Sequence, residues 1–491
     1  MKILLFFFAV LFCINSYSQD TALIINKKFK QGTLPKSYRA ITTVDKNSGE
    51  LHLTLVDNKS VERYIIDSNW KIINQFSSTR GAYTALSDHR FGNMCIIGAG
   101  QKEFGVYSID DKKFEINEID FINKTERFVS ELEVGKKESI ISGFTTSNIF
   151  CLITASKKNS ELNIITNAKN GGLSFDTIPV TLNIISKRLS AAKLMDDAPI
   201  IGPGEQSIEK LAVANKIYYS GSTVYISNEH HDATYITEVN LKTGDIKKKI
   251  FKQQLEGSMP EAIIKGRFNS FLYHNILVNG NLYNSELSIS FYDYNSGDLI
   301  KNYTASENDS LDFKNSAMVF KKKGSAIFEV NRESQLTNTK QFIKKALKGD
   351  LVFALADKGK DQIELLVESY YEPKSGGGGG FSPGIPGGSF STPGGVVTMP
   401  STPGHFTSYG FGNSSVKKNA HFKCIFQPGT FEHIQNGNEV KSIAELVGDE
   451  LDDDNRSVIS IFRKDHFLYL GFYEKKSEAY IIKRMGELVE D

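Results

Sequence analysis

The sequence predicts an all-β protein built from a repeated meander of antiparallel strands, and three observations support this prediction. A unit of strand, tight turn and strand recurs along the chain, as in SISFYDYNSGDLIKNYT at 288–304. A further alternating strand precedes most copies across a polar loop, as in YISNEHHDATYITEV and LYLGFYEKKSEAYII. Segments with helical periodicity are few and short. The pattern therefore indicates one repeated architecture and not a set of unrelated domains.

The turns identify the copies. Each turn is rich in Gly, Asn and Asp, which tolerate the positive φ that tight hairpins need. Eight copies are found, and the one near Ser334 is the weakest, so we expect seven or eight units. Their turns lie at Asn69, Asp111, Gly171, Gly244, Gly297, Ser334, Gly429 and Gly486.

The repetition has a physical reason. One meander cannot bury both of its faces, whereas neighbours stacked in a closed ring cover each other. Four-stranded meanders that repeat every 40 to 50 residues, roughly, are typical of β-propeller blades. The longer, irregular spacing here predicts a seven- or eight-bladed β-propeller of four-stranded antiparallel blades with long decorated loops. Two β-sandwiches are the alternative fold.

At this level the sequence resembles the divergent β-propeller superfamily, in the WD40-like or quinoprotein-like style of exported bacterial proteins. It departs from true WD40 blades because the Gly-His to Trp-Asp signature is absent and Trp70 is the single tryptophan. In propellers whose strands run a to d from the centre outward, the b–c and d–a loops share the face where ligands usually bind. The resemblance therefore implies that the recurring unit is a c–d hairpin on the opposite face.

Three short segments have helical patterns and are expected to be connectors between strands. They are QSIEKLAV at 206–213, TKQFIKKAL at 339–347 and SIAELVGDEL at 442–451.

The first 18 residues have the pattern of a secretory signal peptide. Lys2 precedes an apolar run from Ile3 to Cys13, and Ser16 and Ser18 stand where a signal peptidase prefers small residues. We therefore expect a mature propeller domain at 19–491 that is exported to the periplasm or the cell exterior. The bulky Phe12 argues against lipid attachment at Cys13.

Charge and cysteine content narrow the function further. Without Lys2 the mature chain has 57 basic and 57 acidic residues, so no whole-chain field favours nucleic acid. No other apolar run is long enough to cross a membrane. Cys95, Cys151 and Cys424 remain, and we expect buried free thiols because the first two occupy equivalent places in neighbouring units.

The segment at 375–416 is the most unusual part of the chain. It is rich in Gly and Pro and contains no Asp, Glu, Lys or Arg. Such a composition cannot bury enough apolar surface to offset its ordering entropy, so we expect a flexible insertion in a b–c loop. A tolerated insertion is one interpretation; a partner-binding loop is the other. Its candidate contact residues are Phe381, Phe390, Phe406, Tyr409 and Phe411.

Two polar clusters are candidate metal sites. Glu229, His230, His231 and Asp232 lie in a second predicted b–c loop, and imidazole with carboxylate suits zinc or a similar divalent metal. An exposed polar loop explains the same residues, because no separated third ligand completes a site.

The second cluster is acidic and lies in a predicted d–a loop. Its carboxylates suit calcium, but the order of an EF-hand is absent, which favours a solvated loop. Its members are Asp449, Glu450, Asp452, Asp453 and Asp454.

No nucleophile elbow, P-loop, Cys-x-x-Cys or His-Glu-x-x-His occurs. We therefore predict a noncatalytic exported propeller that binds a protein or polysaccharide of the cell envelope through its b–c and d–a loop face. The alternative is a propeller hydrolase or lyase that uses a divalent metal at Glu229, His230, His231 and Asp232. No other cofactor is expected.

Overall fold

The structure is a computed structural model of the whole chain. Its described residues are 21–27, 39–45, 48–56, 60–79, 94–97, 102–108, 112–146, 149–169, 174–183, 190–196, 198–202, 208–230, 232–254, 267–283, 285–322, 332–358, 361–371, 389–392, 395–398, 418–437, 441–451 and 455–487.

Seven sheets of four or five strands follow one another along the described part of the chain. Sheets 1, 2, 3 and 5 are meanders of four consecutive strands, as the repeated pattern predicts. Sheet 1 contains β2 (Arg39–Val44), β3 (Leu51–Val56), β4 (Ser60–Ile66) and β5 (Ile72–Thr79); sheet 2 contains β6 (Met94–Ile97), β7 (Lys102–Ser108), β8 (Lys113–Asp120) and β9 (Thr125–Glu133). Sheet 3 contains β10 (Glu138–Thr146), β11 (Ile149–Ser156), β12 (Glu161–Thr166) and β13 (Asp176–Thr181); sheet 5 contains β19 (Arg267–Tyr273), β20 (Ile276–Tyr283), β21 (Glu286–Asp293) and β22 (Leu299–Ser306).

Sheet 4 is the same meander with one short strand added at its inner edge. Its strands are β14 (Ile200–Ile201), β15 (Lys216–Ser220), β16 (Thr223–Glu229), β17 (Ala233–Asn240) and β18 (Ile246–Lys252). β14 pairs with β15 in parallel, whereas the other strands of this sheet pair antiparallel.

Sheets 6 and 7 take their outer strands from earlier in the chain. Sheet 6 has the order β24-β23-β29-β26-β25, and sheet 7 has the order β1-β32-β31-β30. The N-terminal strand thus completes the last sheet. The strands of sheet 6 are β23 (Met318–Lys322), β24 (Arg332–Leu336), β25 (Asp350–Asp357), β26 (Ile363–Tyr371) and β29 (Lys418–Phe426); those of sheet 7 are β1 (Thr21–Asn26), β30 (Arg456–Lys464), β31 (Phe467–Glu474) and β32 (Ala479–Glu487).

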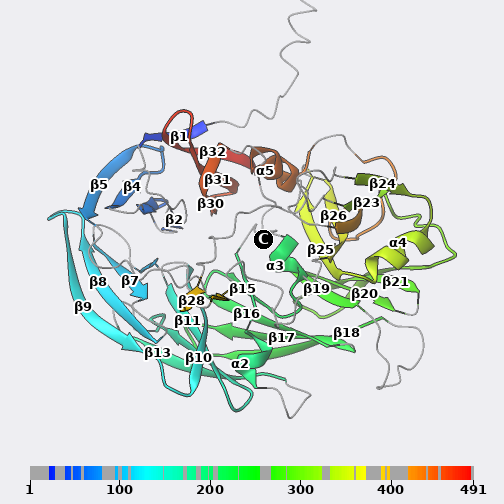
Figure 1. The fold of residues 1–491 in the computed structure, drawn as a ribbon, viewed down its shortest axis with the longest axis horizontal. Coiled ribbons are helices and arrows are strands. Elements are labelled where there is room, and N and C mark those ends of the chain that lie inside the picture. The colour runs from blue at the N-terminus through cyan, green and yellow to red at the C-terminus, as the bar shows by residue number, and fades with distance from the viewer. Residues whose placement is uncertain are drawn as a thin grey trace, which may run out of the picture.

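Figure 1 shows the sheets succeeding one another around a common centre, with one edge strand of each near that centre. A buried apolar cluster spans each boundary between neighbouring sheets. Tyr469 of sheet 7 and Leu53 of sheet 1 belong to one cluster, and Phe76 of sheet 1 and Ile119 of sheet 2 belong to another. Further clusters continue to sheet 6, where Ala356 packs with Leu470 of sheet 7. Apolar contacts therefore connect each sheet to the next one along the chain, and they also connect sheet 6 to sheet 7.

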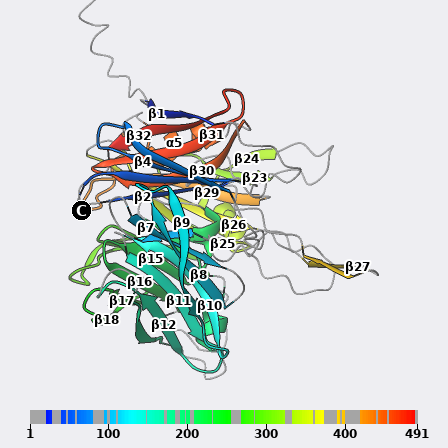
Figure 2. The same cartoon turned by 90° about the vertical axis from the view of Figure 1, so that its left-hand side faces the viewer.

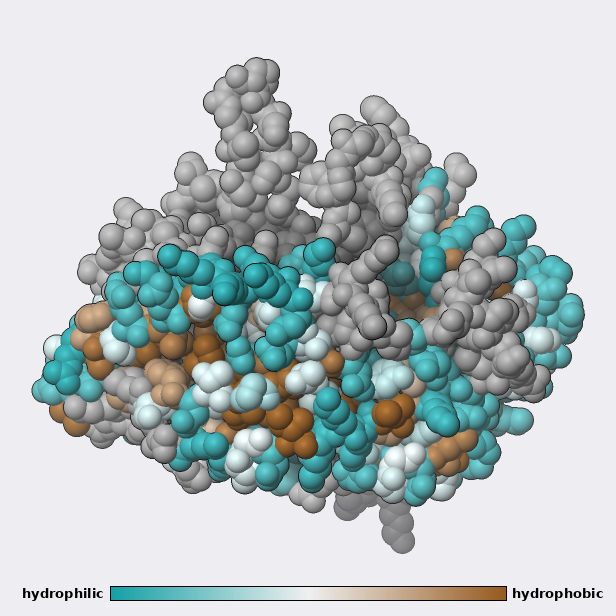
Figure 3. Space-filling view, turned by 90° about the horizontal axis from the view of Figure 1, so that it is seen from below, coloured by the Kyte–Doolittle hydropathy of each residue, from teal (hydrophilic) through white to brown (hydrophobic). Residues whose placement is uncertain are grey.

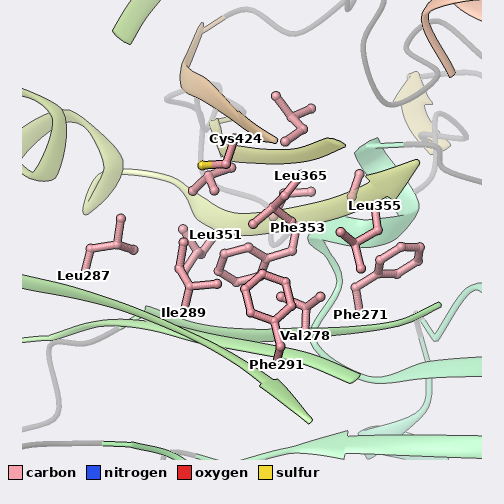
Figure 4. Close-up of a cluster of buried hydrophobic side chains, with 14 of the residues drawn as sticks. Phe271, Val278, Leu287, Ile289, Phe291, Leu351, Phe353, Leu355, Leu365 and Cys424 are labelled. Carbon is pink, nitrogen blue, oxygen red and sulfur yellow. The ribbon is translucent and has the colours of Figure 1, made fainter. Parts of the chain in front are cut away.

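The largest cluster joins sheets 4, 5 and 6. Figure 4 shows Phe291 and Val278 of sheet 5 directed at Phe353 of sheet 6, with Cys424 nearby. Gly280 permits this packing, because an added Cβ would lie 2.1 Å from Phe353 Cζ. A side chain at position 280 would therefore separate the two sheets.

The structure confirms several predicted turns. Gly244 has a φ of 78° between β17 and β18, and Gly297 has a φ of 82° between β21 and β22. Gly429 has φ of 80° in the turn after β29, and Asn69 lies in the turn between β4 and β5. The predicted turn at Gly171 lies outside the described residues.

The predicted turn at Asp111 lies outside the described residues. The strands that flank it, β7 and β8, pair antiparallel as expected, but they are the second and third strands of sheet 2 and so form a b–c and not a c–d hairpin. Two other predicted turns are wrong. Ser334 pairs with Phe320 inside β24, and Gly486 pairs with Leu468 inside β32. Glycine and serine mark a turn only when the chain reverses there, and at these two positions the strand continues.

The three predicted helices are confirmed as α3 (Ile208–Ala212), α4 (Thr339–Ala346) and α5 (Ile443–Leu451). A further short helix, α2 (Ala191–Leu194), begins after Ser190, whose side chain accepts from the Lys193 amide. No helix in the described part of the chain is long and apolar enough to cross a membrane. Cys424 is a buried free thiol, as predicted, and Cys151 is buried, whereas nothing is described of the side chain of Cys95.

Candidate functional site

The inner strands of sheets 4, 5 and 6 begin on the same side of the molecule. Arg267, at the start of β19, donates from Nε to the Gly349 carbonyl just before β25, at 2.7 Å. Lys216, at the start of β15, donates to Asn269 near the start of β19. Because these strands run in the same direction, the connections between their second and third strands open on this same face, which we call the loop face.

A buried polar cluster lies beneath the loop face between sheets 4 and 5. It consists of Lys216, Glu229, Thr234, Asn269 and Ser270. The fully buried Lys216 donates from Nζ to Asn269 Oδ1 at 2.5 Å and to the Ala214 carbonyl at 3.3 Å. The Glu229 carboxylate accepts from Thr234 Oγ1 at 2.9 Å and from Ser270 Oγ.

Asn269 links this cluster to α3 and to sheet 6. Its Nδ2 donates to the Leu211 carbonyl of α3 at 2.8 Å and to the Leu351 carbonyl of β25. Figure 1 places α3 close to the centre, beside the inner strands of sheets 4 and 5. One side chain thus ties three consecutive sheets together with polar contacts.

Burial sets the electrostatics of the cluster. Desolvation lowers the pKa of Lys216 to about 8, and the nearby negative charge of Glu229 only partly opposes this shift. Desolvation also raises the pKa of Glu229, against the effects of Lys216, Ser270 and Thr234. Both shifts favour the neutral forms, as expected of ionisable groups removed from water.

The structure separates the predicted metal ligands at 229–232. The Glu229 carboxylate turns towards sheet 5, whereas His230 Nδ1 contacts Asp232 Oδ1 at 2.5 Å at the surface. His231 lies outside the described residues. Within the described ranges, no three His, Cys, Asp or Glu side chains come together as a metal site. The four-residue site therefore stays a prediction.

The acidic cluster is partly described. Asp449 and Glu450 lie on α5, where Asp449 pairs with Lys441 at 2.6 Å and Glu450 pairs with Lys483 at 3.0 Å. Asp452, Asp453 and Asp454 lie outside the described residues. The two described carboxylates thus bind lysines of the chain itself.

The Gly- and Pro-rich segment joins β26 to β29, two neighbouring strands of sheet 6. It is therefore a connection between second and third strands, as predicted, and opens on the loop face. Its described parts are β27 (Ser389–Thr392) and β28 (Gly395–Thr398), which pair antiparallel, with Phe390 opposite Val397. The candidate residues Phe381, Phe406, Tyr409 and Phe411 lie outside the described residues.

Sequence reasoning missed most members of the buried polar cluster around Glu229. Lys216, Asn269 and Ser270 lie at the starts of two strands in different sheets, and no local motif marks them. The available signal was a lysine at the start of an otherwise apolar strand, KIYYS. A buried strand position normally excludes lysine unless a polar partner compensates for it.

No family model matches the chain, and no curated protein matches its sequence. Among solved structures, it is similar to an oligogalacturonate lyase in complex with manganese at 8% identity, over 96% of this chain and 98% of that chain, with a TM-score of 0.33. It is also similar to the WD40 domain of SCAP from fission yeast at 7% identity, over 92% and 85% of the chains, with a TM-score of 0.34. The dihydro-heme d1 dehydrogenase NirN in complex with DHE has 8% identity, covers 92% and 67% of the chains and has a TM-score of 0.33.

These likenesses are weak, with TM-scores of 0.33 to 0.34 and identities of 7 to 8%, and none of them carries an argument about this chain. Because one fold can host many functions, the function of this chain depends on its own sites.

Proposed function

We propose that this chain is an exported, noncatalytic β-propeller that binds a protein or polysaccharide of the cell envelope through its loop face, in the periplasm or outside the cell. The observation that carries this proposal is the place of the Gly- and Pro-rich segment between β26 and β29. Figure 2 shows β27, which belongs to this segment, standing away from the stacked sheets. An insertion at this position presents itself to a partner without disturbing the ring.

We infer that the seven sheets are the seven blades of one closed ring. Two observations support this inference: β1 completes sheet 7, and Ala356 of sheet 6 packs with Leu470 of sheet 7. Closure by strands from both ends of the chain removes the open face that a row of sheets would leave. A closed ring also gathers loops from distant parts of the chain on one face.

The aromatic side chains of the inserted segment are the proposed contact residues. Aromatic residues supply much of the binding energy at protein interfaces. Because 375–416 contains no Asp, Glu, Lys or Arg, its binding chemistry is apolar contact together with hydrogen bonds from the backbone and from uncharged polar side chains. The proposed anchors are Phe381, Phe390, Phe406, Tyr409 and Phe411.

The proposal is tested by pull-down from the native envelope fraction. Tyr371 and Lys418 are paired across β26 and β29, so an Asn-Gly turn can replace 372–417 and leave sheet 6 intact. A second variant keeps the segment and replaces its five aromatic anchors with serine. We expect both variants to lose the partner while their melting temperatures match the wild type. Retention of every partner by both variants would contradict the proposal and favour a purely structural envelope component.

The second candidate function is a hydrolase or lyase that uses a divalent metal at Glu229, His230, His231 and Asp232. The contact of 2.5 Å between His230 and Asp232 favours it, because a carboxylate that orients an imidazole is a frequent feature of metal sites. Metal analysis of the purified protein separates the two functions. A stoichiometric transition metal that disappears in the His230→Ala/His231→Ala variant would favour the enzyme.

A further inference from the structure

Every sheet of the ring ends in an outermost strand whose outer edge pairs with no described strand. Such edges expose backbone N–H and C=O groups, and proteins commonly interrupt them with bulges or proline. Register shifts interrupt β1, β5, β9 and β22, and Pro179 interrupts β13. β24 has only five residues.

β18, the outermost strand of sheet 4, lacks these interruptions. It pairs with β17 without a register shift, from Lys252 opposite Ala233 to Ile246 opposite Val239. It contains no proline and no glycine. Its protection against unwanted pairing is charge alone, supplied by Lys247, Lys248, Lys249 and Lys252.

Two hydrogen bonds establish which residues of β18 face outward. The Asn240 amide donates to the Asp245 carbonyl at 2.9 Å, and the Gln253 amide donates to the Asp232 carbonyl at 2.8 Å. Because bonding alternates along an antiparallel pair, odd-numbered residues of β18 bond to β17. Even-numbered residues therefore direct their N–H and C=O groups away from the sheet.

The outward backbone groups belong to Ile246, Lys248 and Ile250, and no hydrogen bond reaches them from the residues that the structure describes. The open length ends at Lys252, whose carbonyl accepts from Tyr292 Oη at 2.6 Å. This open length suits a short added strand.

The side chains at this edge form a regular pattern. Ile246 and Ile250 are 39% and 58% exposed, and the exposed Lys248 and Lys252 alternate with them on one side of the sheet. Lys249, on the other side, is committed to the Tyr294 carbonyl at 2.6 Å. Figure 3 views the rim from the side of α2 and β17 and shows exposed apolar side chains among hydrophilic ones.

We infer that β18 accepts an extended segment of a partner protein as an added strand, with acidic residues beside Lys248 and Lys252 and apolar residues beside Ile246 and Ile250. Backbone hydrogen bonds supply affinity in this mode, and alternate side chains supply specificity. The lysines repel a cationic strand and attract an acidic one, so charge selects the partner. This site lies on the rim and is independent of the loop face.

The probe for this inference is a fluorescent nine-residue peptide of alternating valine and glutamate, measured by anisotropy at low salt. Ile250→Pro keeps every lysine but removes one outward N–H, and proline is tolerated at that place on an edge strand. Lys248→Glu reverses one charge. We expect each variant to weaken binding about tenfold or more. Lys136→Glu, in the exposed turn before β10, is the matched control and should bind like the wild type.

Three outcomes would overturn the inference: no binding of the valine–glutamate peptide to the wild type, equal binding of a valine–lysine peptide, or unchanged binding by Ile250→Pro. Unchanged binding by Ile250→Pro, together with competition by polyglutamate, would instead identify a basic surface that binds polyanions in general. If Ile250→Pro fails to fold, a peptide N-methylated on its edge-facing residues replaces it, and undiminished binding of that peptide is equally contradictory.

Discussion

At the residue scale, the fully buried Lys216 shows how a lysine is accommodated between apolar sheets. Its Nζ donates to Asn269 Oδ1 at 2.5 Å, and Asn269 Nδ2 in turn donates to backbone carbonyls of α3 and β25. Buried ionisable groups cost stability unless their hydrogen bonds are satisfied. The cluster therefore contributes most to the precise placement of three inner strands.

The lowered pKa of Lys216 predicts a pH dependence of stability. In the unfolded chain lysine has a pKa of about 10.4, whereas in the fold it is about 8. Between these two pH values the unfolded state binds more protons than the folded state. The free energy of unfolding therefore rises with pH, on the order of 1 kcal/mol per pH unit. Urea unfolding at pH 8 to 9.5 should show this rise in the wild type and a smaller rise in Lys216→Met. Parallel curves for the two proteins would refute the assignment.

At the element scale, β1 shows how the two ends of the chain combine in one sheet. It pairs with β32 from Asn26 opposite Ala479 to Thr21 opposite Lys483. Alternation places neighbouring isoleucines on opposite sides, because successive side chains of a strand point to opposite faces. Ile25 is 4% exposed and packs among the residues shared by sheets 7 and 1, whereas Ile24 is 55% exposed.

These two isoleucines offer a matched pair of substitutions. Ile25→Asp buries a carboxylate in an apolar cluster and should lower the free energy of unfolding by about 3 kcal/mol or more. Ile24→Asp stays in solvent and should change it by less than about 1 kcal/mol. Chemical denaturation of both variants measures the difference. Equal effects would mean that β1 does not dock on β32 in this register.

At the scale of the whole molecule, buried clusters join every sheet to both of its neighbours. Sheets connected in this way should unfold as a unit, because the loss of one sheet exposes apolar surface on its neighbours. The single tryptophan provides a local reporter. The ring centroids of Trp70 and Tyr469 are 4.7 Å apart, at the boundary of sheets 1 and 7.

Gly280→Ala tests this coupling from the other side of the ring. The added methyl would meet Phe353 and should destabilise the protein by about 1 to 3 kcal/mol. Gly143→Ala, whose Cβ would find its nearest neighbour at 3.5 Å, is the matched control. In Gly280→Ala we expect the Trp70 fluorescence transition and the far-UV circular dichroism transition to shift together. A Trp70 transition that stays at the wild-type midpoint would show that the sheets unfold separately.

Local patterns predicted most of the strands, because alternation and turn residues are properties of short segments. Gly244 and Gly297 were correctly placed in hairpins, and the three helical segments formed helices. The hairpin of β7 and β8 was predicted as a hairpin but not as the second and third strands of its sheet, because every hairpin of a meander has the same local pattern. The position of β6 at one edge of sheet 2 decides the order of these strands.

The candidate site was less accessible to sequence reasoning. Glu229 was predicted as a metal ligand, but its partner Ser270 comes from β19 of the next sheet, and Lys216 comes from β15, the strand paired with its own. Burial decided the role of Glu229: its carboxylate faces a neighbouring sheet, whereas His230 and Asp232 stay at the surface.

The sequence by itself determined the all-β class, the repeated meander and the position of the uncharged insertion within one sheet, because these depend on local periodicity and composition. Only the tertiary structure decided that β1 completes sheet 7, that β23 and β24 form the outer part of sheet 6, and that β18 has an uninterrupted outer edge. The reason is physical: pairing between strands distant in sequence depends on which surfaces remain uncovered after the local elements have formed, and no short segment encodes that.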